Sequence, residues 1–396
     1  MSTMLSIAFS QHPDPQEAVL QACVQIKNQL NRPTTDLVVV FASPEYVVPE
    51  LQPTITRTLK PKHLAGSSAG GIILSNGVAN RGIALIGINS TDMSFGVSAI
   101  GNVDKRDMYL TGFDLAYRAA QDLYELHHRK GFLIFSQGID KNFTQFIRGV
   151  KESLGKSFPA LGAISSDHFE YTKLSQFFQD QVLNNAAVGL MLGGSLELGV
   201  GCAHGFKPLG KPRTATKVDG PIIHTIDEKP AVEIYRHYLG PEAETLAHMP
   251  LNSCAALYPL GIRLAEPRQY LLRQPIDILQ DGSIVCHEGI PQGAQVHLMM
   301  SNIDSCLDSA VEAAKRAKIS IGEKQAQLIF VFESLARHKV LGRNAFREIQ
   351  AIRDIIGPAT PIIGMCSYGE IGPVGTSNDI RNIYLQNENI LILTIS

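Results

Sequence analysis

Apolar residues at the start of the chain follow an order that alternates between strand-like and helix-like runs. The run Leu5–Ser10 leads to Asp14 and Pro15, which are typical of an N-cap and a first helical residue. The apolar side chains that follow recur every three or four residues and predict one buried helical face: Ala18, Val19, Ala22, Cys23, Ile26 and Leu30. The β-branched run Asp36–Pro44 then predicts a buried strand.

The same order recurs twice more, which indicates an internal repeat. The second strand of each copy is expected at Asp36–Pro44, Gly131–Gly138 and Gln327–Arg337, and the last of these ranges includes the loop that follows the strand. A glycine-containing turn follows at His63–Gly71, Pro159–Ser166 and Pro361–Gly372. A closing strand completes each copy at Ile83–Ile88, Ala186–Leu192 and Asn389–Ser396. We place the start of the third copy at Gln295–Asn302, after a non-repeated segment that runs from Gly205 to Gly293.

This rhythm predicts an α/β (mixed α+β) fold built from about three β-α-β-α-β-β units, with helices packed on mixed sheets. We expect two domains, at residues 1–225 and 226–396. The alternative is that the recurring order of strands and helices is a coincidence, of the kind that any α/β protein can show.

Composition narrows the class of protein. Apolar residues make up 44% and charged residues 18% of the chain, and the net charge is −2, which suits a packed globular protein. There is no basic run of the kind that binds nucleic acid or a membrane surface, no signal peptide and no apolar stretch long enough to span a bilayer. The six cysteines are scattered without a Cys-x-x-Cys pair, so we expect reduced thiols and a cytoplasmic protein.

Four segments together resemble the FIST family, with its N-terminal and C-terminal FIST domains. They are Gly66–Ile72, His204–Gly240, Val331–Ile349 and Pro361–Pro373. The resemblance covers nearly the whole chain. The chain departs from the family in Ser334 and Ala336, where Cys and Gly are frequent, and in Phe206, where another aromatic residue is common.

The resemblance implies a sensory protein that binds a small ligand and works with signal-transduction proteins. Two ligand classes stay open: haem, with nitric oxide as the signal and a histidine kinase as partner, and an amino acid or small carboxylate. An enzyme and a scaffold that binds no ligand are two further possible functions. Because both FIST-like domains fill the chain, we expect its output to pass through another protein.

The first candidate site is Gly66-Ser67-Ser68. Glycine permits close approach of the backbone, and consecutive N–H groups with hydroxyls bind anions. The segment is not a P-loop, because the lysine of that motif is missing. The structural alternative is a tight turn between strands.

The second candidate site combines Arg337, Cys366 and Glu370, at the ends of two segments that we expect to be neighbouring strands. Arg337 is suited to a ligand carboxylate and Glu370 to an amine. The alternative is that Arg337 and Glu370 pair with each other. Cys366 would be a nucleophile only beside a base, and we predict no catalytic residue.

The third candidate site is His204 with Phe206. An imidazole on an apolar wall is the usual proximal ligand of haem iron, with Cys202 as a rival thiolate ligand. The alternative is a hydrogen-bonded structural histidine. We expect the ligand, of either class, near the glycine turns or between the domains.

Overall fold

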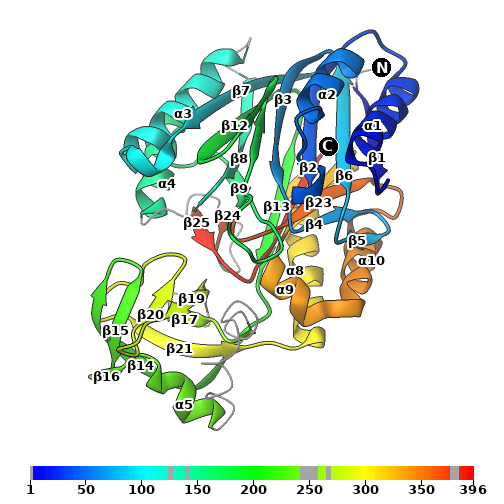
Figure 1. The fold of residues 1–396 in the computed structure, drawn as a ribbon. Helices are drawn as coiled ribbons and strands as arrows, with labels where there is room; N and C mark the ends of the chain where they lie inside the picture. The colour runs from blue at the N-terminus through cyan, green and yellow to red at the C-terminus, as the bar shows by residue number, and fades with distance from the viewer. Residues whose placement is uncertain (1–2, 124–127, 139–141, 241–256, 265–268, 375–382) are drawn as a thin grey trace.

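The computed structural model describes residues 3–123, 128–138, 142–240, 257–264, 269–374 and 383–396. Three six-stranded mixed sheets and one further sheet carry helices on their faces (Figure 1), which confirms the predicted mixed α/β fold class. Among the described residues, none of the helices combines the length and the apolar character that a bilayer span requires.

The first unit occupies the N-terminal part of the chain. Its elements are β1 (Thr3–Ser10), α1 (Pro15–Leu30), β2 (Thr35–Ala42), α2 (Leu51–Leu59), β3 (Pro61–Ser68), β4 (Gly71–Leu74), β5 (Gly77–Ala79) and β6 (Ile83–Ser90). The carboxylate of Asp14 accepts hydrogen bonds from the N–H groups of Gln16 and Glu17, which confirms the predicted N-cap.

The second and third units repeat this order. The second consists of β7 (Met93–Gly101), α3 (Met108–Asp122), β8 (Arg129–Ser136), α4 (Phe143–Leu154), β9 (Ala160–Ile164), β10 (Gln176–Phe178), β11 (Gln181–Leu183) and β12 (Ala186–Gly194). The third consists of β13 (Leu198–Ala203), α8 (Ile303–Ile321), β22 (Leu328–Ser334), α9 (Leu335–Leu341), α10 (Ala345–Ile356), β23 (Ile362–Ser367), β24 (Glu370–Pro373), β25 (Ile383–Gln386) and β26 (Ile390–Ile395).

The units exchange hairpins in a cycle. Each unit forms a four-stranded sheet of the same order, β1-β6-β2-β3, β7-β12-β8-β9 or β13-β26-β22-β23, in which only the last two strands are parallel. The hairpin β4–β5 of the first unit extends the third sheet, β10–β11 of the second extends the first, and β24–β25 of the third extends the second. The three units are therefore interlocked around a pseudo-threefold arrangement.

The predicted start of the third unit was wrong. The segment 295–302 contains β21, which pairs with β14 and β17, whereas the first strand of the third unit is β13, paired with β26. The non-repeated segment thus interrupts the third unit between its first strand and first helix, instead of preceding it. The inserted sheet contains β14 (Lys207–Asp219), β15 (Ile222–Ile226), β16 (Lys229–Pro230), β17 (Leu260–Arg263), β18 (Tyr270–Arg273), β19 (Pro275–Ile278), β20 (Ile284–Cys286) and β21 (Gln295–Met300), with helix α5 (Glu233–Leu239) beside it.

The inserted sheet projects from one end of the three-unit body (Figure 1). The predicted division into residues 1–225 and 226–396 stays a prediction. The pairing of β4 with β23 does, however, join segments from opposite ends of the chain within one sheet.

Side chains from all three sheets meet in a common core. Phe41, Phe135 and Phe332 occupy equivalent positions on β2, β8 and β22 and make edge-to-face contacts, with ring centroids 5.7–6.3 Å apart. The helices cover the outer faces of the sheets, with α1 and α2 on the first sheet. The central strands are buried on both faces, which explains their continuous apolar runs.

The three recurring glycines lie inside strands. Gly66, Gly162 and Gly364 each face a carbonyl of the parallel neighbour, and a Cβ atom there would lie 1.8–2.1 Å from that oxygen. Glycine therefore recurs at these positions because the backbone of the neighbouring strand approaches closely there. The three glycines do not form the tight turns that the sequence suggested.

Candidate functional site

A cavity of about 280 Å³ lies where the third unit meets the inserted sheet. Its walls come from β13 and the chain that leaves it, from α8, from β18 and from the hairpin β24–β25. The lining residues are Cys202, Ala203, His204, Gly205, Phe206, Lys207, Gln269, Tyr270, Ser305, Asp308, Ser309, Glu312, Arg316, Pro373, Gln386 and Asn389. Two candidates from the sequence, His204 and Phe206, thus line one cavity.

One face of α8 supplies most of the charge in this cavity. Ser305, Ser309, Glu312 and Arg316 recur at intervals of three or four residues, and Asp308 lies beside Ser309, so the five form one stripe along the helix. Arg316 donates a hydrogen bond of 2.7 Å to the carbonyl of Cys202 and is paired with Glu312. This stripe was missed because only the apolar face of the helix was used to predict it.

His204 is held by two hydrogen bonds to its neighbours. Its Nδ1 accepts from the N–H of Phe206 at 2.9 Å, and its carbonyl accepts from Arg337 at 2.8 Å. Burial, with the nearby charges of Arg337 and Arg316, lowers the pKa of His204 to about 4. The ring is therefore neutral at pH 7 and carries its single proton on Nε2.

This tautomer does not fit a haem ligand. With Nδ1 accepting and Nε2 protonated, neither ring nitrogen has a free lone pair for iron, whereas a ligating histidine donates its other N–H to an acceptor. The sulfur of Cys202 is already in contact with protein amides, because it lies 3.7 Å from both Asn389 Oδ1 and Gln386 Nε2. Phe206 packs with Leu272 and Met299 as well as lining the cavity.

Arg337 lies behind the cavity wall and is fully buried. It donates to Ser309 Oγ at 2.9 Å and to the carbonyl of His204, both of which belong to cavity-lining residues. It also donates to the carbonyl of Cys306 and forms an ion pair with Glu348 on α10. Its donors are therefore used within the protein, and it braces the cavity instead of offering its guanidinium to a ligand.

Glu370 does not form a hydrogen-bonded pair with Arg337, which was one of the two arrangements expected from the sequence. Its carboxylate accepts from Ser367 Oγ at 2.6 Å and from the N–H of Asn389 at 3.2 Å. Burial raises the pKa of Glu370 to about 8, against the opposing effect of these hydrogen bonds and of Arg337. Asn389 links Glu370 to the cavity, which it also lines.

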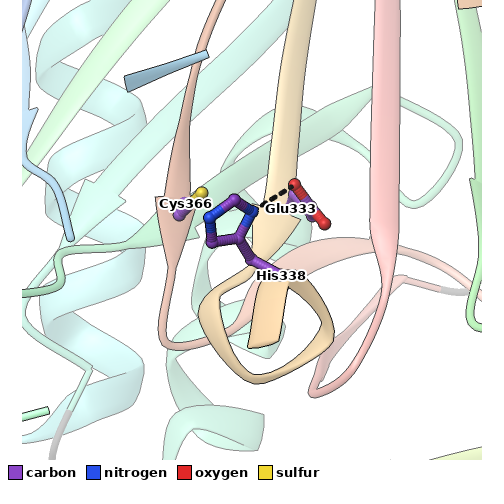
Figure 2. Close-up of side chains that lie close together, drawn as sticks. All are labelled: Glu333, His338 and Cys366. Carbon is purple, nitrogen blue, oxygen red and sulfur yellow. Dashed lines mark ion pairs between the residues drawn. The ribbon is translucent and has the colours of Figure 1, made fainter. Parts of the chain in front are cut away.

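Cys366 meets a histidine and a glutamate in the third unit (Figure 2). Glu333 is the penultimate residue of β22, His338 lies on α9 and Cys366 lies on β23, with one potential ligand atom of each within 4.8 Å of the other two. His338 Nδ1 is 3.9 Å from Glu333 Oε2, which is too long for a hydrogen bond. The sequence pointed to Cys366 as a site residue, but no local motif singled out Glu333.

Gly66, Ser67 and Ser68 lie in β3, outside the residues that line the cavity. Ser67 Oγ donates to Ser165 Oγ at 2.7 Å, and the N–H of Ser68 donates to the carbonyl of Ser175 at 2.8 Å. These partners are protein atoms, so the contacts give no support to an anion site there.

The family comparison agrees with the resemblance seen in the sequence. The FIST N domain matches residues 36–229 and the FIST C domain matches residues 231–373. An uncharacterized protein of Methanocaldococcus jannaschii is 23% identical over 233 residues, which are 56% of this chain and 43% of that protein. The chain thus spans less than half the length of that relative.

Solved structures give a weaker likeness. A cyanuric acid hydrolase from A. caulinodans aligns with 100% of this chain and 99% of its own, at 7% identity and a TM-score of 0.40. Another cyanuric acid hydrolase aligns with 100% of both chains, at 8% identity and a TM-score of 0.37. At these scores neither likeness supports a conclusion about fold or function.

Proposed function

Because this chain belongs to the FIST family, we propose that it is a sensory protein that binds a small zwitterion, such as a free amino acid, between α8 and the inserted sheet. The observation that carries this proposal is the charge of the 280 Å³ cavity. Lys207 supplies a positive charge and Asp308 a negative one, and Arg316 and Glu312 add an ion pair that they form with each other. A wall of balanced charge suits a ligand that carries an ammonium and a carboxylate group.

The size and position of the cavity support a small ligand. Its volume of about 280 Å³ lies just below the roughly 300–1,000 Å³ typical of ligand pockets, as a small ligand requires. The cavity opens at a junction between two structural parts, where such pockets are frequent. Amide side chains of Gln269, Gln386 and Asn389 add neutral donors and acceptors.

The walls of the cavity explain how binding would be sensed. Lys207, Gln269 and Tyr270 come from the inserted sheet or its entry, whereas α8 belongs to the three-unit body. A ligand that contacts both parts favours the arrangement in which they are close, and a partner protein can recognise that arrangement. A histidine kinase is one partner class in keeping with a sensory role.

Haem-based sensing of nitric oxide is the alternative, and the tautomer of His204 weighs against it. The expected result is that haemin added to the purified protein gives no saturable Soret band that depends on His204. A saturable band that shifts with nitric oxide and disappears in His204→Ala would establish the alternative instead.

We also propose binding without turnover. Cys366 is fully buried, and burial together with nearby carboxylates raises the pKa of its thiol well above the usual value, so it is not an activated nucleophile.

The test is a calorimetric and thermal-shift screen of the natural amino acids and small carboxylates, followed by titration of the best ligand into two variants. Asp308→Asn removes a charge from the cavity wall, whereas Asp304→Asn makes the same change one turn earlier on α8, outside the cavity. A charge-assisted hydrogen bond contributes about 1.5–3 kcal/mol, so Asp308→Asn should weaken binding by at least about tenfold. Equal affinities in the two variants, or no ligand in the screen, would refute the proposal.

A further inference from the structure

Several carboxylate oxygens in the core of the third unit lack partners. Glu333 is fully buried, and neither of its carboxylate oxygens has a hydrogen-bond partner among the described residues. Oε2 of Glu348 and both carboxylate oxygens of Glu388 also lack a hydrogen-bond partner among the described residues. A buried carboxylate without partners is costly, so this arrangement calls for a positive group that interacts with it.

The protein supplies little positive charge of its own there. Glu333, Glu348, Glu370 and Glu388 are all fully buried, and their charges influence one another. Arg337 is the cation that acts on this group, and its hydrogen bonds reach only Glu348 among the four carboxylates. Among the described residues, Glu333 has only the ion-pair contact with His338 Nδ1 at 3.9 Å, which balances its charge only if that imidazole is protonated.

Two further donor atoms face Glu333. Nδ1 of His338 is buried and has no hydrogen-bond partner among the described residues, and Sγ of Cys366 lies in the same cluster (Figure 2). The three residues come from β22, α9 and β23, so separate elements of the third unit bring them together. Parallel pairing places Glu333 directly opposite Cys366, which fixes two of the three donors on a rigid sheet.

We propose that Glu333, His338 and Cys366 bind one divalent transition-metal ion of the zinc type. A thiolate, an imidazole and a carboxylate are the donor set that Zn²⁺ and Co²⁺ prefer, whereas Mg²⁺ and Ca²⁺ prefer oxygen donors alone. A divalent ion bound by one thiolate and one carboxylate forms a complex with no net charge, which suits a buried site. Three protein ligands leave a fourth position for water or another small ligand.

The proposed metal site lies next to the residues that support the cavity wall. His338 follows Arg337 on α9, and Arg337 holds the carbonyl of His204 and the hydroxyl of Ser309 in the cavity wall. A metal ion bound to His338 would fix α9 against β22 and β23 and so rigidify this wall. The metal site does not depend on the identity of the ligand in the cavity.

A shared proton is the competing explanation. Burial and the charge of Glu348 raise the pKa of Glu333, so one proton held between the two carboxylates would also relieve their repulsion. That explanation gives His338 and Cys366 no role and predicts no metal binding.

The experiment uses the full chain, treated with a chelator and then dialysed with Zn²⁺ or Co²⁺, with metal content measured by atomic emission. We expect a single equivalent of either ion, no retained Mg²⁺, and a thiolate-to-cobalt charge-transfer band in the near ultraviolet. Cys366→Ser should abolish this band and weaken metal binding by at least about tenfold. Cys23→Ser, which changes another buried thiol on α1, is the matched control and should leave both unchanged.

A second variant protects the test against a folding defect in Cys366→Ser. The side chain of His338 is 17% exposed, so His338→Gln should fold while it weakens metal binding to a similar degree. The proposal is overturned if the wild type retains no stoichiometric Zn²⁺ or Co²⁺. It is also overturned if folded Cys366→Ser or His338→Gln binds the metal as the wild type does.

Discussion

Replacement of Arg337 by methionine tests whether the third unit depends on one buried cation. The guanidinium makes five hydrogen bonds among the described residues, to Glu348, Ser309 and the carbonyls of His204 and Cys306. Both Arg337 and Glu348 have side chains that are 0% exposed. Methionine fills a similar volume but removes the Arg337 donor from all these acceptors, and only the carbonyl of Cys306 keeps another side-chain donor among the described residues, the hydroxyl of Ser309 at 2.8 Å.

The expected cost follows from the unpaired charge. Removal of one partner from a buried ion pair typically destabilises a protein by about 3–5 kcal/mol, because the other charge stays buried without compensation. Replacement of both partners by apolar residues is much less costly, so Arg337→Met combined with Glu348→Leu should recover at least about 1–2 kcal/mol of that loss. The recovery is incomplete, because the hydroxyl oxygen of Ser309 and the carbonyl of His204 still lack the donor that Arg337 supplied.

The assay is urea unfolding followed by far-ultraviolet circular dichroism, with Arg347→Met as the control. Arg347 is exposed on the same helix as Glu348, so its replacement should change stability by no more than about 0.5 kcal/mol. A loss below about 1 kcal/mol in Arg337→Met, or a double variant whose loss equals the sum of the single losses, would refute the interpretation of this pair as a buried structural brace.

Three further predictions concern other parts of the fold. Burial lowers the pKa of His287 to about 4, compared with about 6.5 in the unfolded chain. The unfolded chain therefore binds a proton first as the pH falls, so the free energy of unfolding is highest above about pH 6.5 and decreases down to about pH 4. In urea titrations the wild type should lose about 2–3 kcal/mol of this free energy over that range, relative to His287→Gln. Gly364→Ala should prevent stable folding, because its Cβ would lie 1.8 Å from the carbonyl oxygen of Val331, whereas Gly101→Ala, with no atom within 4 Å, should melt within a few degrees of the wild type. Glu333→Ser should raise or preserve the melting temperature of metal-free protein, because it removes a buried carboxylate without partners; a clear decrease would contradict that account.

Much of the repeat could be predicted from the sequence, because buried strands and glycine contacts leave a strong pattern. The apolar runs predicted the second strand of each unit. The recurring glycines were matched correctly between the units, because they occupy equivalent positions beside the second strands. The first strand of the third unit was missed because β13 contains Gly199 and Gly201, which weaken the pattern of a strand. These glycines are needed there, since a Cβ would lie 2.1 or 1.8 Å from carbonyls of α8.

The site was harder to predict than the fold, because its contacts join residues far apart in the sequence. The cavity joins His204 to α8 across the whole inserted sheet, so no local motif connects them. Arg337 was placed in a loop opposite Glu370, but the chain forms α9 at that point and turns Arg337 toward Glu348 on α10. Identification of the residues was therefore easier than identification of their partners.

The three units provide an internal comparison that shows where the chain departs from its own repeat. The residue after each central phenylalanine is Ala42 in the first unit, Ser136 in the second and Glu333 in the third, at the same point of the parallel pair. A buried glutamate is less favourable for folding than alanine or serine at an equivalent position, so the third unit carries a destabilising residue that the architecture does not require. Its partner across the strands is Cys366, where the other units have Ser68 and Ile164. The inserted sheet interrupts this same unit, and the cavity lies at their junction. The third unit therefore differs from the other two in buried charge, in its buried thiol at this position and in its chain insertion, and it is the unit in which we propose both binding sites.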